Sequence, residues 1–400
     1  MNKVYSAVII GGGASGLFCA IELLKSDNAF DGKDILILER NDRVGKKLIA
    51  TGNGQGNLTN EVIGTDNYYG DRDFVIQFIK QLKEIDLENY LTQLNIPLYR
   101  ADDGKIYPLS RQASAVLDII RSYLGKKDCD IKTGEKVIDL DKTGDIWTIK
   151  TESDRFFAKN VVLATGGKAQ SQFGTDGQGY KLAEKFNHKL TPLYPSLVQL
   201  KTDTSLIKGL KGLKETAKVN VINKGKTIKS ATGDLLFTDF GVSGSSIFMV
   251  SSAVANLTDC KLVIEFLPSL NESDIEKIIT DRLNCEYIEK QDILCGIINK
   301  RIGQAVLKTV KNFTAKCIAK ALKNFTLDIK GSLGFNYAQV TRGGIITKDI
   351  NPLTYESKLV DNLYVIGEML DVDGDCGGYN LTFAFTSAIC SARAIKRGRN

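Results

Sequence analysis

The chain has 400 residues, of which 43% are hydrophobic and 25% are charged, and its formal net charge is +6. This composition excludes a disordered or low-complexity chain, and the length predicts two or three folded domains. Eight cysteines without a Cys-x-x-Cys pair and a single histidine, His188, support neither a zinc site nor a thioredoxin-like redox motif, and we expect His188 to pack structurally. The scattered cysteines indicate a reducing cytoplasm, and no apolar run is long enough to cross a bilayer, so we expect a cytoplasmic protein with no membrane partner.

The chain opens on an apolar strand, 8–10, that enters Gly-x-Gly-x-x-Gly (Gly11, Gly13 and Gly16) and then a helix, so no signal peptide is expected. Such a turn seats a pyrophosphate on the helix N-terminus, where free N–H groups and the helix dipole favour negative charge. A second apolar strand ends in Glu39, where a carboxylate can accept the hydroxyls of an adenosine ribose. Strand, glycine turn, helix and acid together predict a dinucleotide site.

The hydrophobic pattern divides the rest of the chain into sections. Strands and helices alternate over 1–190, as in a nucleotide-binding domain. Short alternating strands occupy 191–270 and 325–342, and they enclose a helical stretch, 271–324. Residues 343–400 return to strand, turn and helix. We therefore expect an α/β fold in which a Rossmann-like nucleotide-binding domain is interrupted by a β-rich domain and a small helical domain.

Two further glycine turns follow apolar strands. Thr165, Gly166 and Gly167 follow one strand, and Gly367 and Glu368 follow another. Glycine turns bring the backbone close to a ligand without an intervening side chain, although each turn by itself also has a purely structural explanation. Together with the first glycine motif, they favour a long cofactor such as FAD over a mononucleotide.

Positive charge is concentrated in two middle blocks, 208–214 and 224–229. These lysines either solvate surface loops or form a surface that meets phosphate, such as that of RNA. The charge pattern does not choose between these explanations, and we expect no DNA partner.

A run rich in glycine and aspartate, 371–384, leads into the last predicted helix. Its Asp-x-Asp-Gly-Asp start is typical of a calcium loop, but Thr382 stands where such a loop has its bidentate glutamate, so no metal is expected. The alternative is a glycine turn into a helix that begins near Asn380. The N–H groups of that helix would face the pyrimidine edge of a flavin and stabilise the negative charge that develops there on reduction.

The segment 45–60, from Gly-Lys-Lys-Leu to Asn-Leu-Thr-Asn, resembles a signature of the BaiN-like family of NAD(P)/FAD-dependent oxidoreductases, which are flavoproteins of the glutathione-reductase type. Blocks 107–113, 195–198, 237–244 and 367–384 resemble further family blocks in the same order. The resemblance covers nearly the whole chain. It implies a Rossmann-like FAD-binding domain interrupted by a β-barrel-like domain and a small helical domain. The FAD contacts expected from the motifs and the resemblance come from Gly11, Gly13, Ala14, Ser15, Gly16, Glu39, Arg40, Lys46, Lys47, Leu48, Gly52, Asn57, Leu58, Thr59, Val137, Thr165, Gly166, Gly167, Gly367, Glu368, Gly378, Tyr379, Asn380 and Leu381.

Two blocks depart from the family pattern. Where family members have Gly-Arg-Cys-Asn, this chain has Gly-Gln-Gly-Asn at 54–57, and Asp239 stands in place of a family histidine. An arginine, a cysteine and a histidine suited to anion contact or proton transfer are thus missing from these positions. Asp239 and Tyr107 become the predicted catalytic acid/base residues, with Glu368 and Cys376 as further candidates.

The resemblance implies an enzyme that transfers hydride between flavin N5 and a conjugated C=C or C–N bond of a small molecule or of a uridine in RNA. No second Gly-x-Gly-x-x-Gly follows a strand, so NAD(P)H, as a transient electron donor, would have to enter the substrate pocket itself. Two alternatives stay open: an FAD-dependent amine oxidase, and a flavin-binding module that binds RNA or protein without turnover. The oligomeric state is left open.

Overall fold

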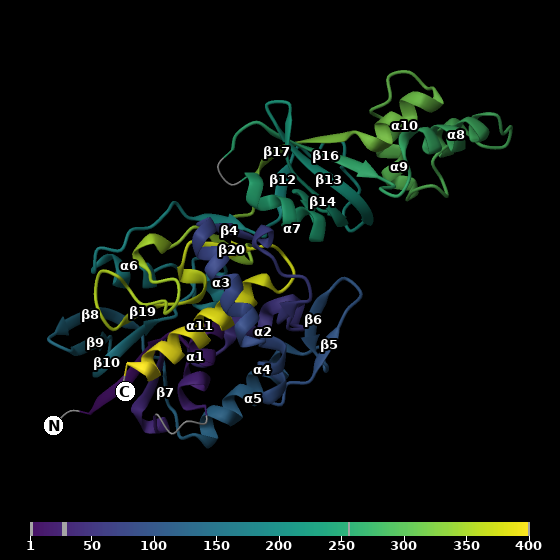
Figure 1. Ribbon diagram of the computed structural model, residues 1–400. Coiled ribbons are helices and arrows are strands. Elements are labelled where there is room, and N and C mark those ends of the chain that lie inside the picture. Colours follow the sequence, from purple (N-terminus) through teal and green to yellow (C-terminus); the bar gives the residue numbers. More distant parts are fainter. Residues whose placement is uncertain (1–2, 26–29, 255–256, 399–400) are drawn as a thin grey trace. The chain divides into compact units, whose positions relative to one another are not determined.

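The computed structural model describes residues 3–25, 30–254 and 257–398. The chain forms two units: Met1–Leu193 together with Val340–Asn400, and Tyr194–Gln339. The second unit is therefore an insertion into the first, as the sequence colours in Figure 1 show. Each unit has its own hydrophobic core.

The first unit is built on a seven-stranded sheet. Its strands lie in the order β7 (Asp130–Thr133), β2 (Ile35–Glu39), β1 (Val4–Ile10), β10 (Arg155–Leu163), β9 (Ile146–Thr151) and β8 (Val137–Thr143), and β19 (Leu363–Val365) also pairs with β10. β7, β2, β1, β10 and β19 run parallel, whereas β9 is antiparallel to both of its neighbours, β10 and β8. Because parallel strands end at one edge of a sheet, the turns after β2, β1, β10 and β19 are brought together there.

Helices and small sheets complete this unit. Its helices are α1 (Ala14–Leu24), α2 (Lys46–Ala50), α3 (Arg72–Ile85), α4 (Leu87–Gln93), α5 (Ala113–Lys126), α6 (Gly179–Glu184) and α11 (Tyr379–Arg397). One small sheet has the order β3 (Thr59–Asn60), β6 (Lys105–Pro108) and β5 (Leu98–Arg100), a second pairs β4 (Tyr68–Gly70) with β20 (Val372–Gly374), and β18 (Val340–Arg342) is a further short strand.

The contact between α1 and α11 fastens the C-terminal helix to the first βα unit. Phe18 stacks on Phe385 with ring centroids 3.9 Å apart. The buried carboxylate of Glu22 accepts hydrogen bonds from the Tyr90 hydroxyl and from Arg393 Nε, both at 2.8 Å. A buried carboxylate is tolerated when it is paired in this way, so segments from the two ends of the chain share one core.

The second unit contains a closed barrel. Its strands lie in the order β12 (Leu200–Thr202), β15 (Gly241–Ser243), β14 (Lys226–Phe237), β13 (Lys214–Asn223), β16 (Cys260–Phe266) and β17 (Phe325–Ser332), and the unit also has β11 (Tyr194–Ser196) and α7 (Ser245–Ser251). Along β13 the alternate residues Ala217, Val219 and Val221 are buried, as the two-residue period of a strand requires.

Three helices, α8 (Glu272–Leu283), α9 (Lys300–Leu307) and α10 (Ala315–Lys323), form the helical part of the second unit. Local side chains define where they begin: Asn271 accepts a hydrogen bond from the amide of Asp274 at 2.9 Å, and Thr314 accepts one from Cys317 at 3.3 Å. Their apolar faces join the barrel core.

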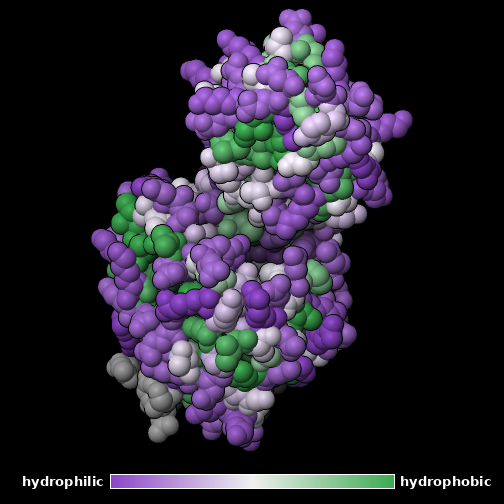
Figure 2. Space-filling view, turned by 90° about the vertical axis from the view of Figure 1, so that its right-hand side faces the viewer, coloured by the Kyte–Doolittle hydropathy of each residue, from purple (hydrophilic) through white to green (hydrophobic). Residues whose placement is uncertain are grey.

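The predicted α/β class, with a Rossmann-type domain and a barrel-like β domain, is confirmed. The units change over at 193/194 and 339/340, beside predicted boundaries at 190/191 and 342/343. On the face drawn in Figure 2 hydrophilic residues prevail, and hydrophobic residues form scattered patches. Within the described ranges we find no helix with the length and apolar character that a membrane crossing requires.

Candidate functional site

The first glycine turn leaves an open space beside the N-terminus of α1. A Cβ atom on Gly11, whose φ is +110°, would lie 2.4 Å from the Ala164 carbonyl oxygen, and one on Gly16 would lie 1.9 Å from the Gly11 carbonyl oxygen. A Cβ on Gly13 would meet no atom within 4 Å, and Gly13, as the N-cap, offers no side chain to the first amides of α1. These amides therefore face open space, which fits a pyrophosphate.

Glu39 is held beside this turn at the end of β2. Glu39 as a whole is 7% exposed, and its Oε2 accepts a hydrogen bond from the Gly12 amide at 2.8 Å. Its Oε1 accepts from the Asn41 amide at 2.8 Å and from Asn41 Nδ2 at 2.7 Å. Because each carboxylate oxygen can accept two hydrogen bonds, Oε2 keeps acceptor capacity for a ribose hydroxyl.

Two more predicted turns lie at the same edge of the sheet. The turn at Thr165–Gly167 follows β10, and Gly367 follows β19, which pairs with β10. A Cβ on Gly367, whose φ is +66°, would lie 2.8 Å from Ser15 Oγ in the first turn of α1. Val137 begins β8, and the amide of Glu135, two residues earlier, donates to the Glu39 carbonyl at 2.9 Å. The structure thus brings these separate predictions together.

Lys47 and Glu368 form an ion pair. Lys47 Nζ lies 2.7 Å from Glu368 Oε2, and Glu368 Oε1 accepts a hydrogen bond from the Thr341 amide at 2.9 Å. Both side chains are about one-fifth exposed. Glu368 is therefore a charged anchor between α2 and the turn after β19. Within α2, Lys46 pairs with Asp42, and Leu48 is buried in the core.

The predicted 45–60 block meets the N-terminus of α11. Gly378, with φ +98°, packs so tightly on β3 that a Cβ would lie 2.4 Å from the Thr59 carbonyl oxygen. Thr59 Oγ1 and Thr382 Oγ1 are 2.8 Å apart. In its favoured orientation the Asn57 amide donates to the Thr59 carbonyl at 3.0 Å and accepts from the Gly378 amide at 3.2 Å.

The side chains around the start of α11 have structural partners. Asn380 Oδ1 accepts from the Gly374 amide at 2.8 Å, and its Nδ2 donates to the Gly374 carbonyl at 2.9 Å. The Tyr379 carbonyl accepts from the Tyr68 hydroxyl at 2.9 Å, and Leu381 packs against the core. Gly378 is the N-cap and has no side chain to cap α11, so backbone amides are what this helix can offer a flavin.

The structure places the two predicted catalytic residues in different units. Tyr107 is a half-buried residue of β6 in the first unit, where a Cβ on Gly52 would lie 3.6 Å from its ring, and burial raises the pKa of its hydroxyl. Asp239 belongs to the second unit, where its exposed carboxylate pairs with Lys211. Of the further candidates, Cys376 is largely buried, which raises the pKa of its thiol.

His188 is a buried residue of the first unit. Its Nε2 lies 2.8 Å from Ser357 Oγ. Burial lowers the pKa of the His188 imidazole. Both findings describe a side chain that packs within the fold.

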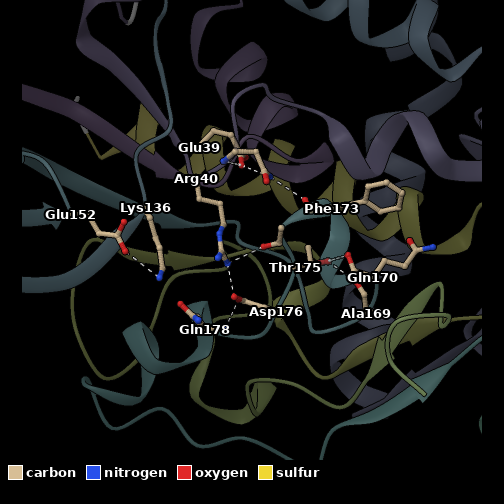
Figure 3. Close-up of polar contacts among 12 residues, drawn as sticks. Glu39, Arg40, Lys136, Glu152, Ala169, Gln170, Phe173, Thr175, Asp176 and Gln178 are labelled. Atoms are coloured by element: carbon tan, nitrogen blue, oxygen red, sulfur yellow. Dashed lines mark hydrogen bonds and ion pairs between the residues drawn. The ribbon is translucent and has the colours of Figure 1, made fainter. Parts of the chain in front are cut away.

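Sequence reasoning missed the segment that follows the Thr165–Gly167 turn. Arg40, predicted to contact the cofactor, has its Nη1 2.7 Å from Asp176 Oδ2 and 3.2 Å from the Gly174 carbonyl oxygen (Figure 3). The signal that could have found this segment is its polar, glycine-rich composition directly after a buried strand, because loops at the carboxyl ends of parallel strands line ligand sites.

Comparisons with known proteins agree with the family that the sequence motifs resemble. The family described as HI0933-like protein Rossmann domain matches residues 5–394. The chain is 35% identical to the 3-dehydro-bile acid delta(4,6)-reductase of Clostridium scindens, over 98% of this chain and 99% of the relative. It is 26% identical to the ribosomal RNA dihydrouridine synthase of Haemophilus influenzae, over 99% and 100% of the two chains. The solved structure of the 3-ketosteroid-delta4-(5alpha)-dehydrogenase from Rhodococcus jostii RHA1 has a similar fold, with a TM-score of 0.53, 14% identity and coverage of 99% and 98%.

Proposed function

This chain belongs to the HI0933-like family of Rossmann-domain flavoprotein oxidoreductases, and we propose that it is an FAD-dependent reductase of a conjugated C=C bond in a small molecule. The family predicted from the motifs is thereby confirmed. The observation that carries the proposal is the convergence at one sheet edge of an open glycine turn, a ribose-type carboxylate and two further glycine turns, in a chain 35% identical to a reductase over nearly its whole length.

Residues of the first unit would hold FAD. The first amides of α1, beside Gly13, would bind the pyrophosphate, and Glu39 would accept the ribose hydroxyls. The N-terminus of α11 would face the pyrimidine ring, where the helix dipole stabilises negative charge. Bound FAD supplies hydride transfer at its N5 atom.

The chain must also supply a proton, because reducing a C=C bond adds both a hydride and a proton. Tyr107 is our candidate for this role. Its ring lies near Gly52 of the 45–60 block, where a Cβ would be 3.6 Å from it, and its phenol, whose pKa burial raises, is protonated at neutral pH. We further propose that NAD(P)H reduces the flavin. Because the sequence holds one dinucleotide motif, this hydride donor would have to reach the flavin through the substrate's own access.

The small-molecule substrate is supported by the name of the relative with 35% identity, which is a reductase of a 3-dehydro-bile acid. A second candidate substrate is a uridine in ribosomal RNA. It is supported by a relative with 26% identity that is a ribosomal RNA dihydrouridine synthase, and by the second unit, where 20 Lys and Arg against 14 Asp and Glu give a net charge of +6.

The test is a visible spectrum of the purified protein followed by anaerobic addition of NADH or NADPH. We expect a flavin spectrum that bleaches on addition and recovers when a steroid-like enone is added. Recovery on ribosomal RNA but not on the enone would favour the RNA substrate. A flavin that only an amine reduces would favour the oxidase, and a protein that cannot be loaded with FAD would refute the proposal.

A further inference from the structure

A polar segment of the first unit, residues 168–178, links the turn after β10 to α6, and we name it the strap. Its first end is fixed to Thr341, whose Oγ1 accepts hydrogen bonds from the amides of Lys168 and Ala169 at 2.7 and 2.9 Å. The Thr341 amide in turn donates to Glu368 Oε1 at 2.9 Å. The strap therefore begins next to the turn that follows β19.

The other end of the strap is fixed to the residues that follow β2. Arg40 Nη1 lies 2.7 Å from Asp176 Oδ2 and donates to the Gly174 carbonyl at 3.2 Å, and Asn41 Nδ2 donates to the Phe173 carbonyl at 3.1 Å (Figure 3). Gly174 approaches so closely that a Cβ there would lie 2.4 Å from Asn41 Nδ2. The guanidinium of Arg40 lowers the pKa of the Asp176 carboxyl against the opposing effect of burial, so the pair is charged at neutral pH.

The strap contacts the segments that follow the two strands flanking β1. In the sheet β1 lies between β2 and β10. The strap touches the segment after β2 through Arg40, and it touches the turn after β10 through Thr175, whose Cγ2 would lie 2.9 Å from a Cβ on Gly166. The turn at the end of β1 carries Gly13, which faces open space. A ligand on that turn would therefore lie in the gap that the strap bridges.

One side chain joins the strap to the predicted ribose acceptor. Asn41 Nδ2 donates to Glu39 Oε1 at 2.7 Å and also to the Phe173 carbonyl in the strap at 3.1 Å. The Glu39 carboxylate that would bind the ribose and the strap thus share one hydrogen-bond donor, the side-chain amide of Asn41. Opening the strap would free one of the groups that orient Glu39.

We propose that the strap closes over the adenosine and pyrophosphate half of bound FAD, and that the Arg40–Asp176 ion pair controls how fast the cofactor leaves. This inference rests on the proposed FAD site. Arg40 is then a positioning residue that fastens the strap and does not itself bind the phosphates. Both side chains of the pair are about one-third exposed, so its effect is moderate and sensitive to salt.

The experiment measures FAD release from the loaded protein by dilution and ultrafiltration. Asp176→Asn and Arg40→Gln should each accelerate release about fivefold, the effect of losing one partly exposed ion pair. The double variant should release FAD no faster than the faster single variant, because both substitutions remove the same interaction. High salt should accelerate release from the unmodified protein and have less effect on Asp176→Asn.

Glu152→Gln is the matched control. It breaks the Lys136–Glu152 pair, with N and O 3.2 Å apart, which lies just before β8 and just after β9 and does not involve the strap (Figure 3). Release from this variant should be unchanged, and the melting temperature of each apo-protein shows whether the fold is intact. If Asp176→Asn keeps its fold and releases FAD at the unmodified rate, the strap proposal is wrong while the FAD assignment stands. If the unmodified protein cannot be loaded with FAD, both fail.

Discussion

The two units carry their chemistry in different ways. In the first unit 33 basic residues balance 33 acidic ones, whereas the second unit holds 20 basic against 14 acidic residues and so the whole net charge of +6. The candidate cofactor site of the first unit consists mainly of backbone amides and close glycine turns, such as Gly13 and Gly378. A dinucleotide site built from backbone amides needs no net charge. The charge of the second unit resides in side chains, so substitutions can change it without changing the fold.

The largest expected effect tests the backbone site. Gly13→Asp should lower FAD affinity at least about a hundredfold, because it places volume and negative charge where the pyrophosphate would bind. The apo-protein should keep its melting temperature, because a Cβ on Gly13 meets no atom within 4 Å. Isothermal titration with FAD and thermal melting of the apo-protein measure the two effects separately.

Gly16→Ala is the contrasting variant. A Cβ at this position would lie 1.9 Å from the Gly11 carbonyl oxygen, so the helix and the strand would have to move apart. We expect a loss of about 3 kcal/mol in the free energy of unfolding, as for overpacked cores. Equal melting temperatures for Gly13→Asp and Gly16→Ala would contradict the conclusion that Gly13 faces open space while Gly16 is tightly packed.

The next effect concerns proton delivery. Tyr107→Phe should lower kcat for reduction of the C=C bond about a hundredfold, because that step takes a proton from the phenol. Reduction of the flavin by NAD(P)H takes no proton from Tyr107 and should be unchanged. Burial raises the pKa of Tyr107 above its ordinary value of 10. The phenol therefore stays protonated through neutral pH, and the unmodified rate should fall only as the pH rises above 10. Stopped-flow kinetics of both half-reactions would show whether Tyr107 has this role.

A smaller effect tests the charged unit. Lys224, Lys226 and Lys261 are exposed at one end of the β13–β14 and β16 strands, where Ile222 pairs with Lys261 and Asn223 with Lys226. Replacing these three lysines by Gln should reduce the salt dependence of ribosomal RNA binding by about one unit of log–log slope for each phosphate that is no longer neutralised. Filter binding at several salt concentrations measures that slope.

A matched triple variant controls for the general loss of charge. It replaces three exposed lysines of the first unit, Lys80, Lys126 and Lys127, by Gln. Similar slopes for the two triple variants would show that the second unit has no special part in RNA binding.

The smallest effect is a dependence of stability on pH. Burial lowers the pKa of His188 in the folded chain, so the unfolded chain binds this proton more readily. The contribution of neutral His188 to the free energy of unfolding is therefore fully present above the ordinary pKa of about 6.5, and it falls as the pH drops below that value. His188→Gln should narrow the difference in melting temperature between pH 7.5 and pH 5. An unchanged difference would assign the acid sensitivity to other groups.

The sequence predicted the first βα unit well, because its signals are local. Gly11, Gly13, Gly16 and Glu39 lie close enough along the chain for the strand, turn and helix pattern to place them together. The Asn57–Gly378 contact joins segments more than 300 residues apart, and only the resemblance to a family linked those blocks. The partners of single side chains were beyond reach, as with Arg40, whose ion pair with Asp176 depends on how a loop folds back.

By itself the sequence determined the dinucleotide motif, the α/β class and the family, since glycine spacing and hydrophobic period act over short stretches of chain. The tertiary structure decided which groups face open space and which are engaged. It paired Glu368 with Lys47, and it left open the space beside Gly13. Such outcomes depend on contacts between distant segments, and the loss of chain entropy in forming them is offset only when the whole core packs at once.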